Sequence, residues 1–153
     1  MRISGKANVK ANCEAIWALI FNPSALLQLV PGCDQVEQVA PDEYRARLTM
    51  RVPALAGKYE ILIKIVESQA PRFCKLAGKA RGNTGGVEGT GSFTLLAQGK
   101  QTRIDYEAEV QISGPLAGIN PRFAEGVAQT LIRQGLAKLA ELARSSADLQ
   151  GSA

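Results

Sequence analysis

The chain of 153 residues is 46% hydrophobic and 21% charged, a composition typical of one globular domain and unlike that of a disordered or fibrous protein. Its net charge of +4 permits attraction to an anionic membrane or an acidic protein without establishing either. Because the chain contains no histidine, the usual general base, the usual zinc ligand and every histidine-based catalytic triad are excluded. No cofactor, metal site or catalytic residue is predicted.

The N-terminal region shows no signal sequence and no membrane-spanning segment. Its longest apolar run, residues 15–21, is much shorter than the roughly 20 residues needed to cross a bilayer. The three cysteines, Cys13, Cys33 and Cys74, are odd in number and widely spaced, which is typical of reduced thiols. The sequence therefore predicts a cytoplasmic protein.

The first elements are a strand and two short helices. Residues 2–10 alternate between apolar and polar side chains, the pattern of a half-buried strand. Asn12 can cap a helix whose apolar residues recur at helical spacing as far as Phe21. A second short helix is predicted over residues 24–30.

From residue 33 onward the apolar residues recur at every second position. Six strands, each with one apolar face, are expected between five turn signals, at residues 40–42, 54–57, 70–71, 82–86 and 99–100. The glycine-rich run 82–91 lacks the Lys-Ser/Thr ending of a phosphate-binding loop and leads into a strand. It is therefore predicted to be a hairpin whose glycines relieve crowding on a curved strand.

The last element is a long helix. Asn120 is its predicted cap, Pro121 occupies its first position, and the apolar stripe continues to about Ser145. Residues 1–145 are expected to form a single ligand-binding domain, and residues 146–153 a short flexible tail.

This order of elements predicts an α+β fold, with a seven-stranded curved antiparallel sheet wrapped around the long C-terminal helix and two short helices after the first strand. A sheet bent around a helix does not close tightly on it everywhere, so the space between them can hold a ligand. Gly126 and Gly135 lie inside the long helix although each costs about 1 kcal/mol relative to alanine, which we interpret as volume kept open.

The residues expected to line that space are apolar or aromatic and share the inward faces of the strands and helices, although ordinary core packing is the alternative for each of them. They are Trp17, Phe21, Tyr44, Leu48, Met50, Tyr59, Ile61, Ile63, Phe93, Tyr106, Phe123, Val127 and Leu131. Among the strand residues, only Tyr44, Tyr59 and Tyr106 are expected to carry a hydroxyl that faces inward. These hydroxyls could orient a carbonyl or hydroxyl group of a ligand.

Charged side chains are predicted on the outer face of the sheet. The acidic residues of the segment 105–109 would face Arg2, Lys6 and Lys10 if the first strand pairs with the last. A basic set is expected on the middle strands, comprising Arg45, Arg47, Arg51, Lys64, Lys75, Lys79 and Arg81. Because no aromatic residues are interleaved with these cations, nucleic acid is not a predicted partner.

Five short motifs follow one another along residues 1–145: Pro31-Gly32-Cys33, Asp42-Glu43-Tyr44, the glycine-rich hairpin at 82–91, the strand at 103–110 and the loop at 114–118. Together they resemble the CoxG family of carbon monoxide dehydrogenase subunits, within the START-like, polyketide-cyclase-like (SRPBCC) superfamily, which has a helix-grip fold. The resemblance implies a non-catalytic accessory protein that handles a quinone or another apolar molecule. It also implies a molybdenum hydroxylase of the carbon monoxide dehydrogenase type as partner.

Alternatives to this function remain open at this stage. The superfamily includes enzymes of the polyketide-cyclase-like class that act on hydrophobic substrates, and an assembly or recruitment factor without a ligand is a third hypothesis. We interpret the apolar loop 116–119 and the adjacent basic strands as a surface for transient contact with an anionic membrane, at its inner face.

Overall fold

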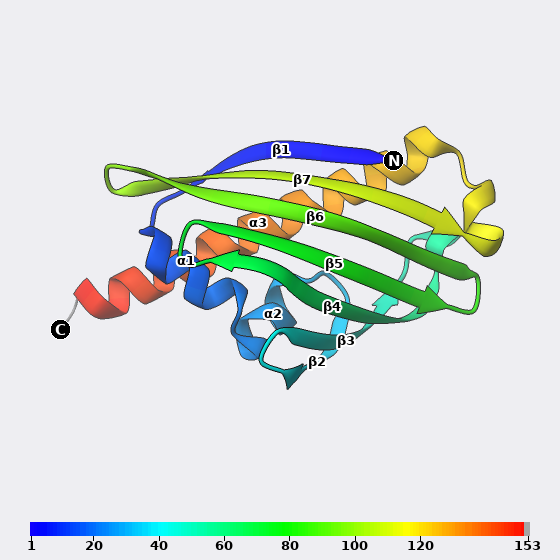
Figure 1. The fold of residues 1–153 in the computed structure, drawn as a ribbon, viewed down its shortest axis with the longest axis horizontal. Helices are drawn as coiled ribbons and strands as arrows, with labels where there is room; N and C mark the ends of the chain where they lie inside the picture. The colour runs from blue at the N-terminus through cyan, green and yellow to red at the C-terminus, as the bar shows by residue number, and fades with distance from the viewer. Residues whose placement is uncertain (152–153) are drawn as a thin grey trace.

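The structure is a computed structural model that describes residues 1–151, with side chains through residue 145. It has the predicted fold class and the predicted order of elements (Figure 1). The elements are β1 (Arg2–Val9), α1 (Cys13–Ile20), α2 (Pro23–Leu29), β2 (Cys33–Ala40), β3 (Glu43–Met50), η1 (Pro53–Leu55), β4 (Gly57–Gln69), β5 (Phe73–Gly82), β6 (Gly85–Gln98), β7 (Gln101–Ser113), η2 (Gly114–Gly118) and α3 (Pro121–Gly151), where η denotes a 3-10 helix.

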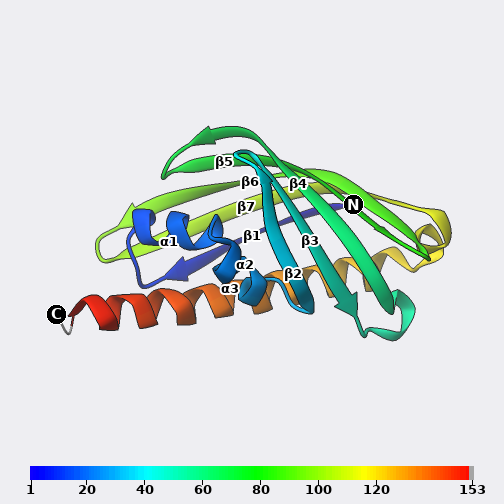
Figure 2. The same ribbon diagram turned by 90° about the horizontal axis from the view of Figure 1, so that it is seen from below.

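All seven strands form one antiparallel sheet in the order β1-β7-β6-β5-β4-β3-β2. The sheet arches over α3, and α1 and α2 cover the same side near one end (Figure 2). The loops η1 and η2 lie with the beginning of α3 at the opposite end of the sheet (Figure 1). One face of the sheet is therefore inner, toward α3, and the other faces solvent.

The first strand pairs with the last one, which meets the condition under which the sequence places opposite charges across the two strands. In this pair Arg2 lies opposite Glu109 and Lys6 lies opposite Asp105. The guanidinium of Arg2 forms an ion pair of 3.2 Å with Glu107. Because both side chains are more than half exposed, this pair contributes at most about 1 kcal/mol.

Asparagine side chains begin the helices, as the sequence predicted for Asn12 and Asn120, whereas the cap at Asn22 was not predicted. Oδ1 of Asn12 accepts from the amide of Ala15 at 2.8 Å, and Oδ1 of Asn22 accepts from that of Ala25 at 3.1 Å. Asn120 does the same for α3, accepting from the second residue after it at 2.9 Å. The predicted tail of residues 146–153 lies outside the part of the chain whose side chains are described, so it stays a prediction.

The interior contains two clusters of buried apolar residues, at the two ends of the molecule. The larger one joins α1, β1, β6, β7 and the C-terminal half of α3, through residues that include Val9, Ile16, Leu95, Ile104 and Leu139. The smaller one consists of Leu48, Tyr59 and Leu116, with partly buried neighbours from η1, from the inner face of the sheet and from the residues that follow α2 and η2.

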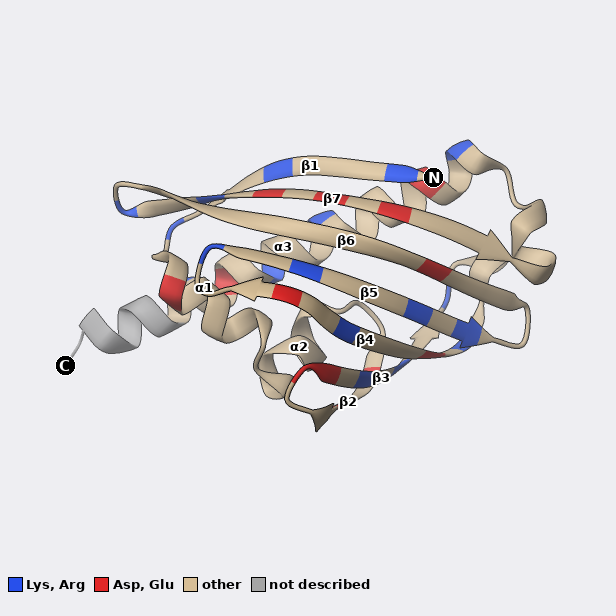
Figure 3. Cartoon of the chain, in the orientation of Figure 1, with Lys and Arg blue, Asp and Glu red and all other residues tan. Residues whose placement is uncertain are grey.

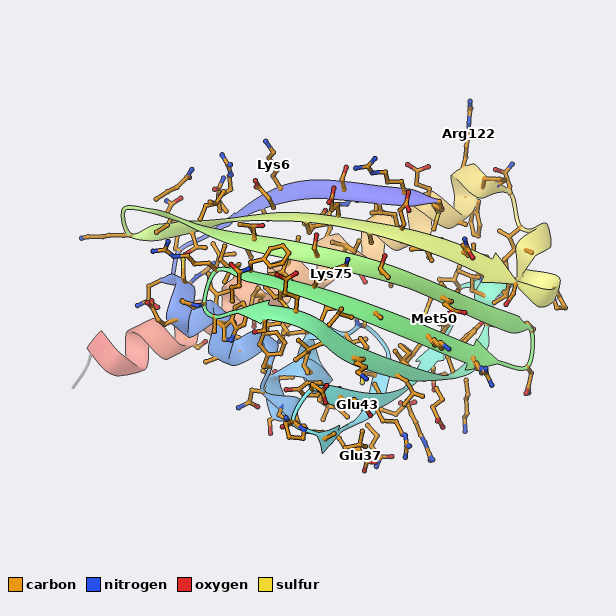
Figure 4. All side chains as sticks on the ribbon, in the orientation of Figure 1. Lys6, Glu37, Glu43, Met50, Lys75 and Arg122 are labelled. Carbon is orange, nitrogen blue, oxygen red and sulfur yellow. The ribbon has the colours of Figure 1, made fainter. Side chains whose placement is uncertain are left out.

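The outer face of the sheet carries charges of both signs (Figure 3). Within the predicted basic set, four cations pair with carboxylates at 3.6 to 4.0 Å, namely Arg45, Arg47, Lys64 and Lys79. Elsewhere Lys6 and Arg122 project away from the ribbon (Figure 4). The outer surface is thus a mixed and largely exposed charge pattern.

Candidate functional site

An apolar cavity of about 300 Å³ lies between the inner face of the sheet and the N-terminal half of α3. Strands β1, β3, β4, β5, β6 and β7 form its walls, and η1 and η2 contribute one leucine each. Its volume is at the lower end of the range found for small-molecule sites. The lining residues are Met1, Ile3, Leu48, Met50, Leu55, Tyr59, Ile61, Ala80, Val87, Val110, Ile112, Leu116, Ala124, Val127, Ala128 and Leu131.

The cavity exists because the two halves of α3 pack differently. Leu136 and Leu139 in the second half fill the space beneath α1 and the adjoining strands. The first half presents Ala124 and Ala128 to the sheet instead, and these short side chains do not span the gap. The short side chains of Ala124 and Ala128 therefore leave space between the first half of α3 and the sheet.

A close helix contact fixes the position of α3 between these halves. A Cβ atom on Gly135 would lie only 3.0 Å from the carbonyl oxygen of Leu29 at the end of α2. Gly135 is thus required for close packing, and our interpretation that it keeps volume open is wrong for this position. A Cβ on Gly126 would meet nothing within 4 Å.

The chemistry of the cavity is that of hydrocarbon. Of the described residues that line it, Tyr59 alone carries a polar side-chain group, and this group is already hydrogen-bonded. Its hydroxyl donates to the carbonyl oxygen of Leu55 at 2.8 Å and lies 3.2 Å from Oγ1 of Thr84. The site therefore offers contact with apolar atoms and no unengaged side-chain donor.

Six of the thirteen residues predicted from the sequence line the cavity: Leu48, Met50, Tyr59, Ile61, Val127 and Leu131. Seven do not, namely Trp17, Phe21, Tyr44, Ile63, Phe93, Tyr106 and Phe123. Phe123 is 44% exposed, near the start of α3. Four of the seven instead form an aromatic cluster that fills the interior near α1.

This aromatic cluster is formed by Trp17, Phe21, Tyr44 and Phe93. The ring centroids of Trp17 and Phe21 are 4.9 Å apart, and those of Trp17 and Phe93 are 5.8 Å apart. Such tilted contacts are the preferred geometry of packed aromatic side chains. The alternation pattern predicts that these side chains face inward. It does not predict whether they fill the core, as they do, or line a cavity.

Two of the three tyrosines predicted to orient a ligand are engaged with backbone carbonyls. Tyr44 donates to the carbonyl oxygen of Phe21 at 2.9 Å, and burial raises the pKa of its hydroxyl. The hydroxyl of Tyr59 donates to the carbonyl oxygen of Leu55, and the ring of Tyr106 covers Gly5 of the neighbouring strand.

The sequence interpretation also missed Thr102, a fully buried inward-facing residue whose hydroxyl donates to the carbonyl oxygen of Ala11 at 2.7 Å.

The lining residues that we did not predict come mainly from strand ends and loops. Val110 and Ile112 belong to the inward face of the last strand, so their alternation was a usable signal. Ala124 and Ala128 are four residues apart on one helix face, a spacing that also places Leu131 beside them. Leu116 lies in η2 and is only 3% exposed, although the sequence suggested a loop that could contact a membrane.

Depressions of about 540 and 610 Å³ on the outer face of the sheet are larger than the cavity but differ from it in chemistry. They are lined by exposed charged residues such as Lys64, Glu88, Lys58 and Arg81. Because water competes for the charged and polar groups of these depressions, size alone does not make them ligand sites. The apolar space beneath α3 is the candidate site.

Neither a metal site nor a membrane-spanning helix is found in the described part of the chain. No group of three or more Cys, Asp or Glu side chains there is placed to hold a metal ion. No described helix is long and apolar enough to cross a membrane.

Burial raises the pKa of the Cys74 thiol to about 11, and burial is also the main cause that raises the pKa of Cys33.

A curved antiparallel sheet that grips a long C-terminal helix, with an apolar cavity between them, places the protein in the START-like helix-grip class. The sequence profile of the CoxG family of carbon monoxide dehydrogenase subunits matches residues 5–143. The chain therefore belongs to the CoxG family. A comparison with curated protein sequences found no significant match.

Solved structures support the same fold. A conserved protein from Geobacillus kaustophilus is 27% identical, with a TM-score of 0.91 over 95% of this chain and 97% of the other. A START superfamily protein from Mycobacterium smegmatis is 12% identical, with a TM-score of 0.74 over 94% and 97%. The Zhui aromatase/cyclase from Streptomyces sp. R1128 is 10% identical, with a TM-score of 0.64 over 97% and 93%; at this identity it shows the fold alone.

Proposed function

We propose that the protein is a non-catalytic accessory protein that binds an apolar or quinone-like molecule in the cavity beneath α3. Its partner would be a molybdenum hydroxylase of the carbon monoxide dehydrogenase type, as membership of the CoxG family suggests. The observation that carries the proposal is the cavity itself, whose walls are apolar on the sheet, on both loops and on the helix. Water gains little from occupying such a space, whereas an apolar ligand gains free energy by leaving bulk water.

An enzyme of the polyketide-cyclase-like class is the competing function, and the chemistry of the cavity argues against it. General acid–base catalysis requires an ionisable side chain within hydrogen-bond reach of the substrate. Tyr59 is the one ionisable side chain among the described lining residues, and its proton is engaged with Leu55. A ligand-free assembly factor is the third candidate, and it gives no reason for an unfilled apolar space.

Transient contact with an anionic membrane would involve the loop end of the molecule rather than Leu116, which is buried. Pro115 and Ala117 in η2 and Phe123 at the start of α3 are exposed there. Arg122 is exposed beside Phe123. Apolar contact combined with charge attraction supports weak, reversible binding to a membrane surface.

Titration with a menaquinone analogue, followed by calorimetry, tests the ligand half of the proposal. Ala128→Trp would fill the cavity and should lower the affinity at least ten-fold, because a bulky ring replaces the volume the ligand needs. Ala137→Trp, at an exposed position of the same helix, is the matched control and should bind as the unmodified protein does. Binding that is absent from the unmodified protein, or equal in both variants, would contradict the proposal.

Co-purification tests the partner half. The protein should be retained by a molybdenum hydroxylase of the carbon monoxide dehydrogenase type, and ligand binding should not require that enzyme. Retention without any ligand binding would favour the assembly-factor alternative.

A further inference from the structure

We infer that the part of the ligand held in this cavity is a hydrocarbon chain of about ten carbons, and that the polar head of the ligand stays outside. This inference rests on the proposed function, because it specifies the ligand of the same cavity. It follows from the polarity, the volume and the length of the site.

Polarity excludes a carbonyl-bearing head group from the interior. A quinone ring brings carbonyl oxygens that are hydrogen-bonded in water. In the cavity the described side chains leave them no donor, since the Tyr59 hydroxyl is held by the carbonyl oxygen of Leu55 at 2.8 Å. Burying a carbonyl without a partner lowers affinity by about ten-fold or more. A methylene chain has no such requirement.

The volume corresponds to a short chain. The cavity measures about 300 Å³. The share of one water molecule in the liquid is about 30 Å³, and a methylene group is of similar size. About ten methylene groups therefore fill the site.

The length of the cavity along the helix also suits such a chain. The lining residues of α3 extend from Ala124 to Leu131. At a rise of 1.5 Å per residue this is about 10 Å, close to the length of an extended chain of about this size.

Two further features suit a flexible chain with an external head. Both methionines of the protein, Met1 and Met50, line the cavity, and their unbranched side chains adapt to varying ligand shapes. Met1 is 38% exposed, more than the other lining residues. The head group is therefore expected on the Met1 side of the cavity.

A chain-length series tests the inference. The affinities of n-alkanols from six to fourteen carbons are measured by displacement of a fluorescent apolar probe. Affinity should rise about four-fold per methylene group up to about ten carbons and then level off. A naphthoquinone without a side chain should bind at least ten-fold more weakly than the same ring carrying a decyl chain.

Variants on opposite walls of the cavity make the test independent of any single substitution. Ala128→Leu adds three carbons from the helix, so the plateau should shift from about ten to about seven carbons. Ala80→Val adds two carbons from β5 and should shift it to about eight, even if the helix variant fails to fold. Ala137→Leu, at an exposed position of α3, should leave the plateau unchanged.

The outcomes separate this inference from the proposed function. A tailless naphthoquinone that binds as tightly as the decyl derivative, or a plateau that neither wall variant shifts, would overturn the chain inference while the carrier function stands. If neither chains nor quinones bind, the proposed function fails as well.

Discussion

The hydroxyl of Tyr59 allows a direct test of whether the cavity recognises polar groups. In the structure this hydroxyl connects β4 to the carbonyl oxygen of Leu55 in η1, at 2.8 Å. Tyr59→Phe removes the hydrogen bonds to Leu55 and, at 3.2 Å, to Oγ1 of Thr84, which together contribute about 1–2 kcal/mol to the free energy of unfolding. For a domain of this length the melting temperature should fall by about 2–8 °C. The affinity for an apolar ligand should change by less than about two-fold.

Tyr44→Phe is the matched control, because Tyr44 is equally buried and also donates to a backbone carbonyl, at 2.9 Å, but lies outside the cavity. Thermal unfolding and ligand displacement measured on both variants should show the same pattern, a modest loss of stability with nearly unchanged binding. If Tyr59→Phe instead lowers ligand affinity ten-fold while Tyr44→Phe does not, the Tyr59 hydroxyl binds the ligand and our reasoning about the cavity is refuted.

Substitutions at four further positions test the packing of the fold outside the cavity. Gly126→Ala should raise the free energy of unfolding by about 0.5–1 kcal/mol. Gly135→Ala should give no such gain, because its Cβ would meet the backbone of α2. Equal gains for both variants in denaturant titrations would contradict this. Thr102→Val should cost about 1–3 kcal/mol because it leaves the carbonyl oxygen of Ala11 without its donor, and Thr102→Ser should recover most of that loss. Burial raises the pKa of Cys74 to about 11 from 9.0, so the neutral thiol is favoured in the folded state. Its contribution to the stability of the fold is therefore complete below about pH 9 and is lost as the pH rises toward 11. The stability difference between the unmodified protein and Cys74→Ala should accordingly shrink by about 2–3 kcal/mol over that range, and a constant difference would contradict the assigned shift.

The fold could be predicted from the sequence because each element carries a local signal. Strand alternation fixes which side chains face inward, and asparagine caps fix where the helices begin. The charge pattern of the segment 105–109 predicted cross-strand ion pairs on the condition that the first strand pairs with the last, and Arg2 and Glu107 form such a pair. These signals act within a few residues or between neighbouring strands, so they require no knowledge of the whole interior.

The position of the cavity was harder to predict because it depends on how far α3 stands from each part of the sheet. Trp17 and Phe93 have the same inward-facing pattern as Ile61, yet the first two pack in the aromatic cluster and the third lines the cavity. That distance depends on contacts such as the one between Gly135 and Leu29, which joins segments about a hundred residues apart in the sequence. No local pattern contains this information.

The distribution of side-chain size along α3 links the stability of the protein to its proposed function. Leu136 and Leu139 bury apolar surface against the core, which holds the second half of the helix in place. Ala124 and Ala128 make fewer apolar contacts with the sheet in the first half, and a bound hydrocarbon chain can make those contacts instead. A ligand that fills the space should therefore stabilise the fold through the same contacts that the leucines make at the other end.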